Sequence, residues 1–168
     1  MGSNLTEAEL RIHRVCFTGH RPEKLNYPEK VVKSLLKEQI EMAIEDGYRT
    51  FISGMARGLD LWAAEIVLEL KKKNKDKEIH LICALPHPDF EKKWKLTEQI
   101  KYNSILKKAD LKRIICPEFS MGAYQKRNIW MVDRSNRVIA AYNGEKGGTK
   151  NTIDYANKVG VKVINIFE

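Results

Sequence analysis

The sequence predicts an α/β protein: a Rossmann-like three-layer α/β/α sandwich with a mostly parallel sheet. Six β-rich apolar runs alternate with segments whose apolar residues recur at helical spacing. A helix-length segment between two strands forms a crossover, and crossovers join parallel strands. The chain of 168 residues also has the size of one domain. We therefore expect a single domain over residues 14–168, preceded by an N-terminal arm over residues 1–13.

The first half of that domain contains three predicted strands and two predicted helices. In chain order they are strand 14–19, helix 29–46, strand 48–54, helix 59–72 and strand 79–85. The strands are rich in β-branched and aromatic residues, and Gly47 ends the first helix. An apolar stripe from Leu59 to Leu70 marks the second helix. Pro86 and Pro88 end the third strand, because proline cannot donate to a central ladder.

The second half continues the same alternation. In chain order the elements are helix 89–108, strand 112–116, helix 124–135, strand 137–142, helix 149–159 and strand 162–167. Within the first of these helices, we expect Trp94, Ile100 and Leu106 to face the core. Pro117 closes the strand that follows it.

The formal net charge of +8 favours anionic partners such as nucleotides, nucleic acid or an acidic membrane surface. Part of that excess lies in the run KKKNKDK at 71–77, which is typical of a solvated helix end and loop. No stretch approaches the roughly 20 consecutive apolar residues that cross a bilayer. We therefore expect a cytoplasmic protein that does not bind membranes.

The three cysteines, Cys16, Cys83 and Cys116, lie far apart, each in or beside a strand-like run. No C-x-x-C pair occurs, and an odd count argues against a disulfide framework. We interpret them as small buried residues in a reducing compartment. Histidine, cysteine and acidic residues nowhere show metal-ligand spacing, so we expect no metal site and no required cofactor.

Glycines and arginines gather in the loops that follow the predicted strands. TGHRP follows the first strand, SGMARGLD the second, PHPDF the third and NGEKGGT the fifth. Parallel strands end at one edge of the sheet, where α/β proteins bind their ligands. Glycine lets a phosphate approach the free N–H groups of a helix N-terminus, and arginine pairs with phosphate oxygens. The expected ligand-binding residues in these loops are Thr18, Gly19, His20, Arg21, Ser53, Gly54, Arg57, Gly58, Asp60, Gly147, Gly148 and Thr149.

Some of these residues also have a structural interpretation. Asp60 falls in the first turn of a predicted helix, where it can cap the helix or accept a hydrogen bond from a ribose hydroxyl. His20 is a candidate acid/base group or phosphate donor, and it can equally bond the loop backbone. Neither G-x-G-x-x-G nor G-x-x-x-x-G-K-[ST] occurs, so the sequence does not support an ordinary NAD dehydrogenase or a P-loop NTPase.

The segment YQKRNIWMVDRSN at 124–136 presents a polar helical face. A polar face is usually solvated, but this helix leads into the fifth strand and can lie over the mouth of the cleft. We therefore add Arg127 and Asn128 to the expected ligand-binding residues. Tyr124 or Trp130 would then stack on a base.

The segments CFTGHRP, FISGMARGLDLWAAEIVLEL and RNIWMVDRSNRVIAAYNGEKGGTKNTIDYA together resemble the YpsA-like proteins of the SLOG superfamily. That superfamily also contains the DprA/Smf DNA-processing proteins and the LOG enzymes. The resemblance covers nearly the whole chain after about residue 14, and SGMARGLD is similar to the S-G-x-A-x-G-[IL]-D signature of DprA. It implies a Rossmann-like fold, a nucleotide-type ligand at the strand ends, and a possible homodimer or higher homo-oligomer.

The LOG enzymes carry P-G-G-x-G-T-x-x-E, whose glutamate assists cleavage of a glycosidic bond. When Gly148 and Thr149 are aligned with the G-T of that motif, Thr152 stands where the glutamate would be. Threonine cannot supply the charge that steadies an oxocarbenium-like centre. The resemblance therefore implies a protein that holds a nucleotide rather than one that cuts it.

Three hypotheses for the function follow. The first is a binding protein that senses or sequesters a nucleotide derivative such as NAD, ADP-ribose or a cyclic signalling nucleotide. The second is a nucleotide N-glycosidase or phosphoribohydrolase, for which the catalytic candidates are His20, Asp133 and Glu145. The third is a single-stranded nucleic-acid-binding module, which the positive charge favours but which lacks the usual interleaved aromatic residues.

Overall fold

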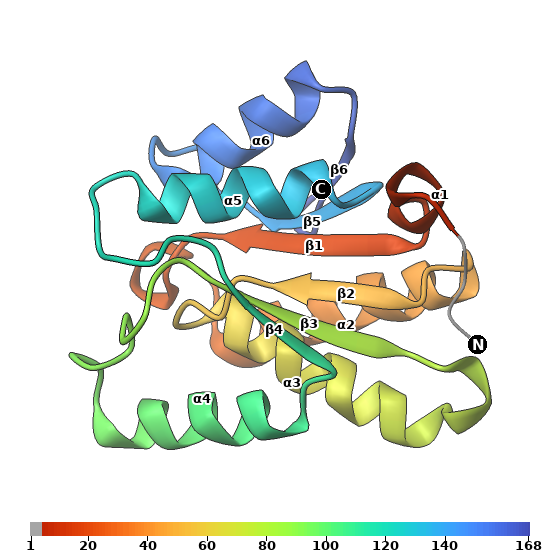
Figure 1. Ribbon diagram of the computed structural model, residues 1–168, viewed down its shortest axis with the longest axis horizontal. Coiled ribbons are helices and arrows are strands. Elements are labelled where there is room, and N and C mark those ends of the chain that lie inside the picture. The colour runs from red at the N-terminus through yellow and green to blue at the C-terminus, as the bar shows by residue number, and fades with distance from the viewer. Residues whose placement is uncertain (1–4) are drawn as a thin grey trace.

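The computed structural model describes residues 5–168, and these form the α/β fold that the sequence predicts (Figure 1). The strands build one all-parallel sheet in the order β4-β3-β2-β1-β5-β6. Their bounds are β1 Arg14–Gly19, β2 Thr50–Ser53, β3 His80–Leu85, β4 Leu111–Ile114, β5 Arg137–Ala141 and β6 Lys162–Asn165. Each strand is joined to the next by a crossover, as parallel pairing requires.

Helices cover both faces of the sheet (Figure 1). Their bounds are α1 Glu7–Arg11, α2 Glu29–Glu45, α3 Leu59–Lys73, α4 Leu96–Lys108, α5 Ala123–Asp133 and α6 Gly148–Lys158, with short 3-10 helices η1 Pro22–Lys24 and η2 Lys75–Lys77. Helices α2, α3 and α4 pack side by side on one face, and α5 packs beside α6 on the other. The result is a three-layer sandwich.

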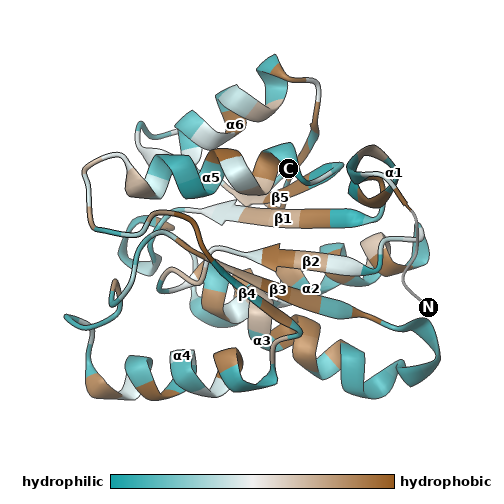
Figure 2. Cartoon of the chain, in the orientation of Figure 1, coloured by the Kyte–Doolittle hydropathy of each residue, from teal (hydrophilic) through white to brown (hydrophobic). Residues whose placement is uncertain are grey.

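Side chains that alternate along each strand supply two separate cores. Val15 and Phe17 of β1 belong to the larger core under α2, α3 and α4, whereas Cys16 between them belongs to the core under α5 and α6. The neighbouring strand keeps the same register, so Phe51 lies beside Val15 and Ile52 beside Cys16. Figure 2 shows these strands as the most hydrophobic part of the chain. A strand buried on both faces needs such a continuous apolar sequence.

The structure differs from the prediction at the helix expected over 89–108, which begins only at Leu96. Asp89 has a positive φ of 62°, and a left-handed residue there interrupts any helix. Ile100 is 59 % exposed, so its assignment to the core was wrong, and Tyr102 and Ile105 are the buried anchors of α4. Trp94 lies before the helix and is only partly buried against the core, as is Leu106 within it.

Part of the segment assigned to an N-terminal arm is helical. Helix α1 begins after Thr6, whose hydroxyl accepts the N–H of Glu9, while the Glu9 carboxylate accepts the N–H of Thr6. This reciprocal capping box stabilises the first turn of so short a helix. Arg11 Nε then donates to the carbonyl of Ser135 at 2.9 Å, which ties α1 to the end of α5. Residues 1–4 of the segment lie outside the described part of the chain.

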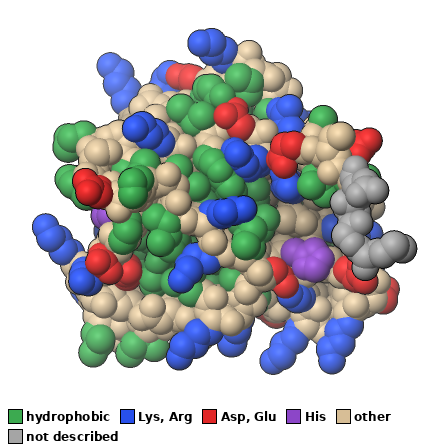
Figure 3. Space-filling model, in the orientation of Figure 1, with side chains coloured by type: hydrophobic (Ala, Val, Ile, Leu, Met, Phe, Trp, Pro, Cys, Tyr) green, Lys and Arg blue, Asp and Glu red, His purple; other side chains and the backbone are tan. Residues whose placement is uncertain are grey.

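The edge strand β4 is open to solvent along its length. Leu111 and Ile114 are 44 % and 47 % exposed, and Figure 3 shows hydrophobic side chains gathered near the middle of this view with lysines and arginines around them. The chain moves outward from β1 to β4 and then returns to β5 on the other side of β1. This reversal makes the carboxyl ends of β1 and β5 the switch point of the sheet, where a crevice is expected.

Candidate functional site

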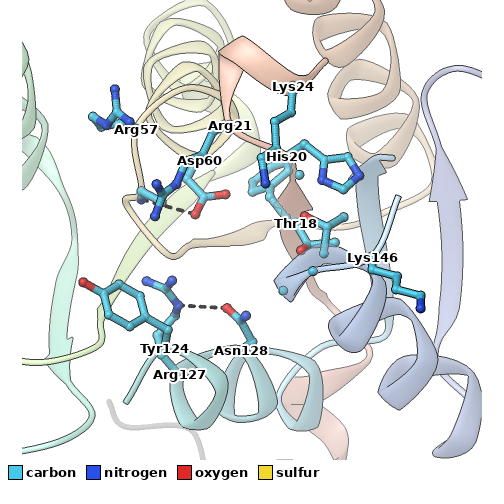
Figure 4. A pocket seen from close by; sticks show the side chains of 16 residues that line it. Thr18, His20, Arg21, Lys24, Arg57, Asp60, Tyr124, Arg127, Asn128 and Lys146 are labelled. Atoms are coloured by element: carbon cyan, nitrogen blue, oxygen red, sulfur yellow. Dashed lines mark hydrogen bonds between the residues drawn. The ribbon is translucent and has the colours of Figure 1, made fainter. Parts of the chain in front are cut away.

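A cavity of about 400 Å³ lies at this switch point (Figure 4). We call it the rim pocket. It is lined by Phe17, Thr18, Gly19, His20, Arg21, Lys24, Ala56, Arg57, Asp60, Tyr124, Arg127, Asn128, Lys146, Gly147, Gly148 and Thr149. The loops after β1, β2 and β5 form most of its wall, and the first turns of α5 form the opposite side. Its volume falls within the range of small-molecule sites, roughly 300–1,000 Å³.

The loop after β2 is held by hydrogen bonds that link it to Ser53 at the end of β2 and to Asp60 in the first turn of α3. The Ser53 hydroxyl donates to the carbonyl of Asp60 at 2.8 Å and accepts the N–H of Met55 at 3.1 Å. The Asp60 carboxylate accepts the N–H of Ala56 at 3.2 Å. Met55 is fully buried with a positive φ of 61°, a conformation that costs energy for a non-glycine residue and persists only when its surroundings hold it. These contacts hold the loop in the conformation that forms the pocket wall.

Two glycines allow the loops after β1 and β2 to approach each other. Gly58 has a φ of 84°, and a Cβ there would lie 2.5 Å from Cδ of Pro22. A Cβ on Gly19 would lie 2.4 Å from Cδ2 of Leu59. A side chain at either position would force the two loops apart and open this wall of the rim pocket.

Arg127 of α5 is the most buried cation of the site, with only 4 % of its surface exposed. Its Nη1 donates to the carbonyl of Gly54, just after β2. Its Nε donates to Oδ1 of Asn128 at 2.9 Å (Figure 4). Burial lowers the pKa of this guanidinium, and the nearby negative charge of Asp60 opposes that effect. Arginine nevertheless keeps its proton at neutral pH, so the pocket contains a buried positive charge.

Asp60 is the buried acid that faces this arginine, and it is 8 % exposed. Burial raises the pKa of its carboxyl to about 6, against the lowering effects of Arg127 and of the Ala56 N–H. Desolvation dominates because the carboxylate accepts only one backbone hydrogen bond in the structure. Asp60 is thus ionised at pH 7 and gains a proton in mildly acidic solution.

Four further cations surround the mouth of the pocket: Arg21, Lys24, Arg57 and Lys146. Arg57 is the most constrained of them, because its Nη2 lies 3.3 Å from Oε1 of Glu23 and its Nη1 lies 3.9 Å from Oε1 of Glu98. The other three have exposed side chains. Among the residues that line the cavity, five are cationic and one, Asp60, is acidic, so the lining carries a net positive charge.

The N-terminus of α6 closes the pocket on the side of β5. Gly147 is its N-cap, with a φ of 143°, and no side chain caps the first turn. The free N–H groups and the positive end of the helix dipole therefore remain available to an anion. Thr149 is buried in this turn, and its hydroxyl belongs to the pocket wall. The Thr152 hydroxyl instead donates to the carbonyl of Gly148 at 2.8 Å, inside the helix.

His20 lines the pocket with 6 % of its surface exposed. Its ring stacks on Tyr142 at 5.4 Å between centroids, and its Nε2 is buried without a hydrogen-bond partner. Burial lowers the pKa of the imidazole, as does Lys24, while Glu145 raises it by a smaller amount than burial lowers it. The ring is therefore neutral at pH 7 and retains one unused polar atom.

Most of the predicted ligand-binding residues meet in this one cavity. Ser53, Gly54 and Gly58 do not line it, and they instead shape and support the loop after β2. Phe17, Lys24, Ala56 and Lys146 line the cavity without having been predicted. The two lysines follow the predicted strands closely, so the loop positions alone could have identified them.

The three catalytic candidates do not form one cluster in the pocket. His20 lies at the carboxyl edge of the sheet, whereas Asp133 ends α5 just before β5 begins, at the opposite edge, and accepts a hydrogen bond from the Tyr155 hydroxyl. The charge of Glu145 raises the pKa of His20, but Glu145 is exposed and does not line the pocket. Tyr124 reaches the pocket, but Trp130 packs against the core under α5 and α6. Of the two aromatic residues expected to stack on a base, Tyr124 is thus the one that lines the pocket.

The chain resembles known bacterial proteins. The YspA SLOG family model matches residues 15–162. The SPbeta prophage-derived protein YoqJ of Bacillus subtilis is 34% identical over 151 residues, which are 82% of this chain and 84% of that protein. A UPF0398 protein of Macrococcus caseolyticus is 28% identical over 167 residues, which are 90% of both.

Two solved structures share the fold. DNA processing protein A from Helicobacter pylori, described for its single-stranded DNA binding mode, superposes with a TM-score of 0.61 at 19% identity. DNA processing protein A (DprA) from Streptococcus pneumoniae gives a TM-score of 0.53 at 16% identity. The match covers 94% and 92% of this chain but only 66% and 50% of those chains. At such identities the likeness establishes the fold alone.

Two kinds of feature are missing from the described part of the chain. Residues 5–168 contain no helix long and apolar enough to cross a membrane. Within the same residues, no three or more histidine, cysteine or acidic side chains are grouped so that they could hold a metal ion.

Proposed function

The chain belongs to the YspA SLOG family, and on that premise we propose that it binds a nucleotide derivative in the rim pocket. The ligand is of the type of NAD, ADP-ribose or a cyclic signalling nucleotide, and the protein senses or sequesters it. One observation carries the proposal: several cationic side chains and an uncapped helix N-terminus meet in one cavity at the switch point of the sheet. Both features favour phosphate.

Each wall of the rim pocket has a role in this proposal. The phosphates lie against the first turn of α6, where N–H groups and the Thr149 hydroxyl donate to them. Arg21 and Arg57 neutralise their charge from the opposite loops. Asn128 and the free Nε2 of His20 bond the sugar hydroxyls, and Tyr124 stacks on a ring. The hydrogen bonds of the loop after β2 position Arg57 for this role.

Binding without turnover agrees better with the geometry than glycosidic cleavage does. Cleavage needs a carboxylate free to act on the anomeric carbon or on water. Asp60 is the carboxylate that lines the pocket, and it is buried and bonded to the Ala56 N–H. Thr152 has no carboxylate and spends its hydroxyl on the helix backbone. We therefore expect NAD and AMP to be recovered intact after prolonged incubation with concentrated protein.

Calorimetric titration with ADP tests the proposal, in wild type and in Arg21→Ala. Arg21 is exposed, so its removal tests the ligand contact without disturbing the core. A charged hydrogen bond to phosphate is worth about 1.5–3 kcal/mol, so we expect affinity to fall about tenfold or more. Arg113→Ala on the exposed edge strand β4 is the matched control and should keep full affinity. Failure of ADP, NAD, ADP-ribose and cyclic AMP to bind at all would refute the proposal.

A second candidate is the binding of single-stranded nucleic acid. A neighbouring cavity, lined in part by Lys93, Lys95 and Trp94, extends the cationic surface from the rim pocket. Cations with accessible aromatic rings are what single-strand binders use. The Helicobacter pylori neighbour is described for that activity. Such binding would weaken steeply as salt rises, with a slope set by the number of phosphates contacted.

A further inference from the structure

Beside the rim pocket lies a second cavity of about 530 Å³, which we call the aromatic chamber. The two share Arg21, Ala56, Arg57 and Tyr124 as a common boundary. The chamber extends from there to Phe90, Trp94 and the start of α4. Each cavity is large enough for one small-molecule group, since known sites begin at roughly 300 Å³. The site therefore consists of two compartments with a charged boundary.

The inner wall of the chamber is a cluster of aromatic rings held in fixed positions. Trp94 meets Phe90 edge to face at 5.3 Å and Tyr102 at 5.6 Å, and Phe90 meets Tyr102 at 5.5 Å. Phe90 and Tyr102 are buried, whereas Trp94 is only partly buried and lines the chamber. The exposed part of the Trp94 ring can thus contact a ligand, while Phe90 and Tyr102 hold the ring in position.

Tyr124 lines both cavities, and other side chains pack against its ring as well. Its ring meets His87 edge to face at 5.8 Å, and the Arg127 guanidinium lies 5.8 Å from its centroid. Even so, 39 % of Tyr124 is exposed, so the ring can still contact a ligand. The buried Nδ1 of His87 bonds the carbonyl of Pro88 at 2.7 Å, which fixes the orientation of the ring beneath Tyr124.

The charges divide between the boundary and the outer edge of the chamber. Arg21 and Arg57 stand at the boundary, while Lys93 and Lys95 stand at the outer edge. Glu98 is the acidic residue of the lining, and it lies 3.9 Å from Arg57. An anionic linker would thus meet two arginines midway between the two compartments. A ring on either side of that linker would meet Tyr124 or Trp94.

Resting on the proposed function, we infer that the ligand is a dinucleotide with two ring-bearing ends joined through a pyrophosphate. One nucleoside occupies the rim pocket, and the linker lies between Arg21, Arg57 and the first turn of α6. The second ring enters the aromatic chamber and packs on Trp94. A mononucleotide fills only the first compartment, so Trp94 is the residue that distinguishes the two ligand classes.

Two probes that differ in the second ring test this inference: ADP and diadenosine diphosphate. Stacking of a base on an aromatic side chain contributes about 1–3 kcal/mol, so diadenosine diphosphate should bind about tenfold tighter than ADP. Its charge is lower than that of ADP, so simple electrostatic attraction predicts the opposite order. In Trp94→Ala the two probes should bind equally, with the ADP affinity of the wild type retained.

Tryptophan fluorescence gives a second measurement that does not depend on removing the ring. Diadenosine diphosphate should quench the wild type more than ADP does. Trp94→Phe, which keeps an aromatic ring and the packing of the cluster, should lose that extra quenching while it keeps most of the affinity. Trp130→Phe is the matched control, because Trp130 of α5 packs against the core on that face of the sheet and lines neither cavity. It should retain the extra quenching.

The outcomes separate this inference from the proposed function. If ADP binds but diadenosine diphosphate gains nothing, or keeps its gain in Trp94→Ala, the two-ring ligand is refuted and the nucleotide site stands. If neither probe binds and NAD, ADP-ribose and cyclic AMP also fail, the proposed function falls and this inference falls with it. A single-stranded deoxyadenosine oligonucleotide that binds more tightly than diadenosine diphosphate would assign the chamber to a polynucleotide and also overturn the inference.

Discussion

Arg127 of α5 donates a hydrogen bond to the carbonyl of Gly54 at the end of β2, across 73 residues of sequence. The contact joins a helix on one face of the sheet to the loop that carries Arg57 and leads into Asp60 in the first turn of α3. A Cβ on Gly54 would lie 3.0 Å from the guanidinium, so the absence of a side chain there makes room for the arginine. The shape of the rim pocket depends on this contact, because it positions α5 against the loop after β2.

We predict that Arg127→Met destabilises the protein by about 3 kcal/mol. The variant leaves the Gly54 carbonyl without its donor and the Asp60 carboxylate without the cation that offsets its burial. Urea unfolding at pH 7 measures the change. Lys126→Met, at an exposed position of the same helix, should alter the free energy of unfolding by less than about 0.5 kcal/mol. Equal stabilities for the two variants would show that the buried contact is unimportant.

A second prediction concerns Gly58, the N-cap of α3. Gly58→Ala should destabilise the fold by about 2 kcal/mol or more, because alanine is strained at a φ of 84° and its Cβ would overlap Pro22. The comparison is Gly122→Ala at the N-cap of α5, where φ is −92° and a Cβ would have nothing within 4 Å. That variant should cost less than about 1 kcal/mol. Thermal unfolding measures the stability that each variant loses. Similar losses for the two variants would mean that position 58 has no particular need for glycine.

The third prediction is a pH dependence that arises from Asp60. Its pKa is about 6 in the folded protein and near 3.8 in the unfolded chain, so the native state binds the proton more tightly. The free energy of unfolding therefore falls as pH rises from about 4 to 6, because the buried carboxyl ionises. Above pH 6 this whole loss of stability is present. For a group only 8 % exposed, this amounts to about 3 kcal/mol.

Asp60→Asn removes this titration while its side-chain oxygen can still accept the Ala56 N–H. The difference in the free energy of unfolding between the variant and wild type should therefore shift in favour of the variant by about 3 kcal/mol from pH 4 to pH 7. The pKa of His20 is lowered in the fold, so its protonation in acid also destabilises the protein. That effect is the same in wild type and variant, and it cancels when their free energies of unfolding are compared. Denaturant unfolding at several pH values provides the measurement. A difference that stays constant with pH would mean that Asp60 is not perturbed by burial.

Much of the fold could be predicted from local sequence. Apolar runs rich in β-branched residues located all six strands. The signal is strongest for the central strands, because a strand buried on both faces must be apolar throughout. Helix α4 shows where predictions from local sequence fail. Ile100 has the type and spacing of a core residue, yet α4 lies at the edge of its layer and leaves that side chain in solvent. Periodicity identifies an apolar face, but it does not reveal whether a partner covers that face.

The candidate site divides in the same way. The sequence by itself determined which loops meet, because parallel strands place all their carboxyl ends on one edge. Only the tertiary structure decided which residues line the cavity and which support it. Ser53 and Gly58 were predicted to contact the ligand, but they do not line the cavity and instead support the loop after β2. Asp133 was a catalytic candidate, but it lies at the opposite edge of the sheet. The reason is physical: a side chain's role depends on the groups packed around it, and those come from distant parts of the chain.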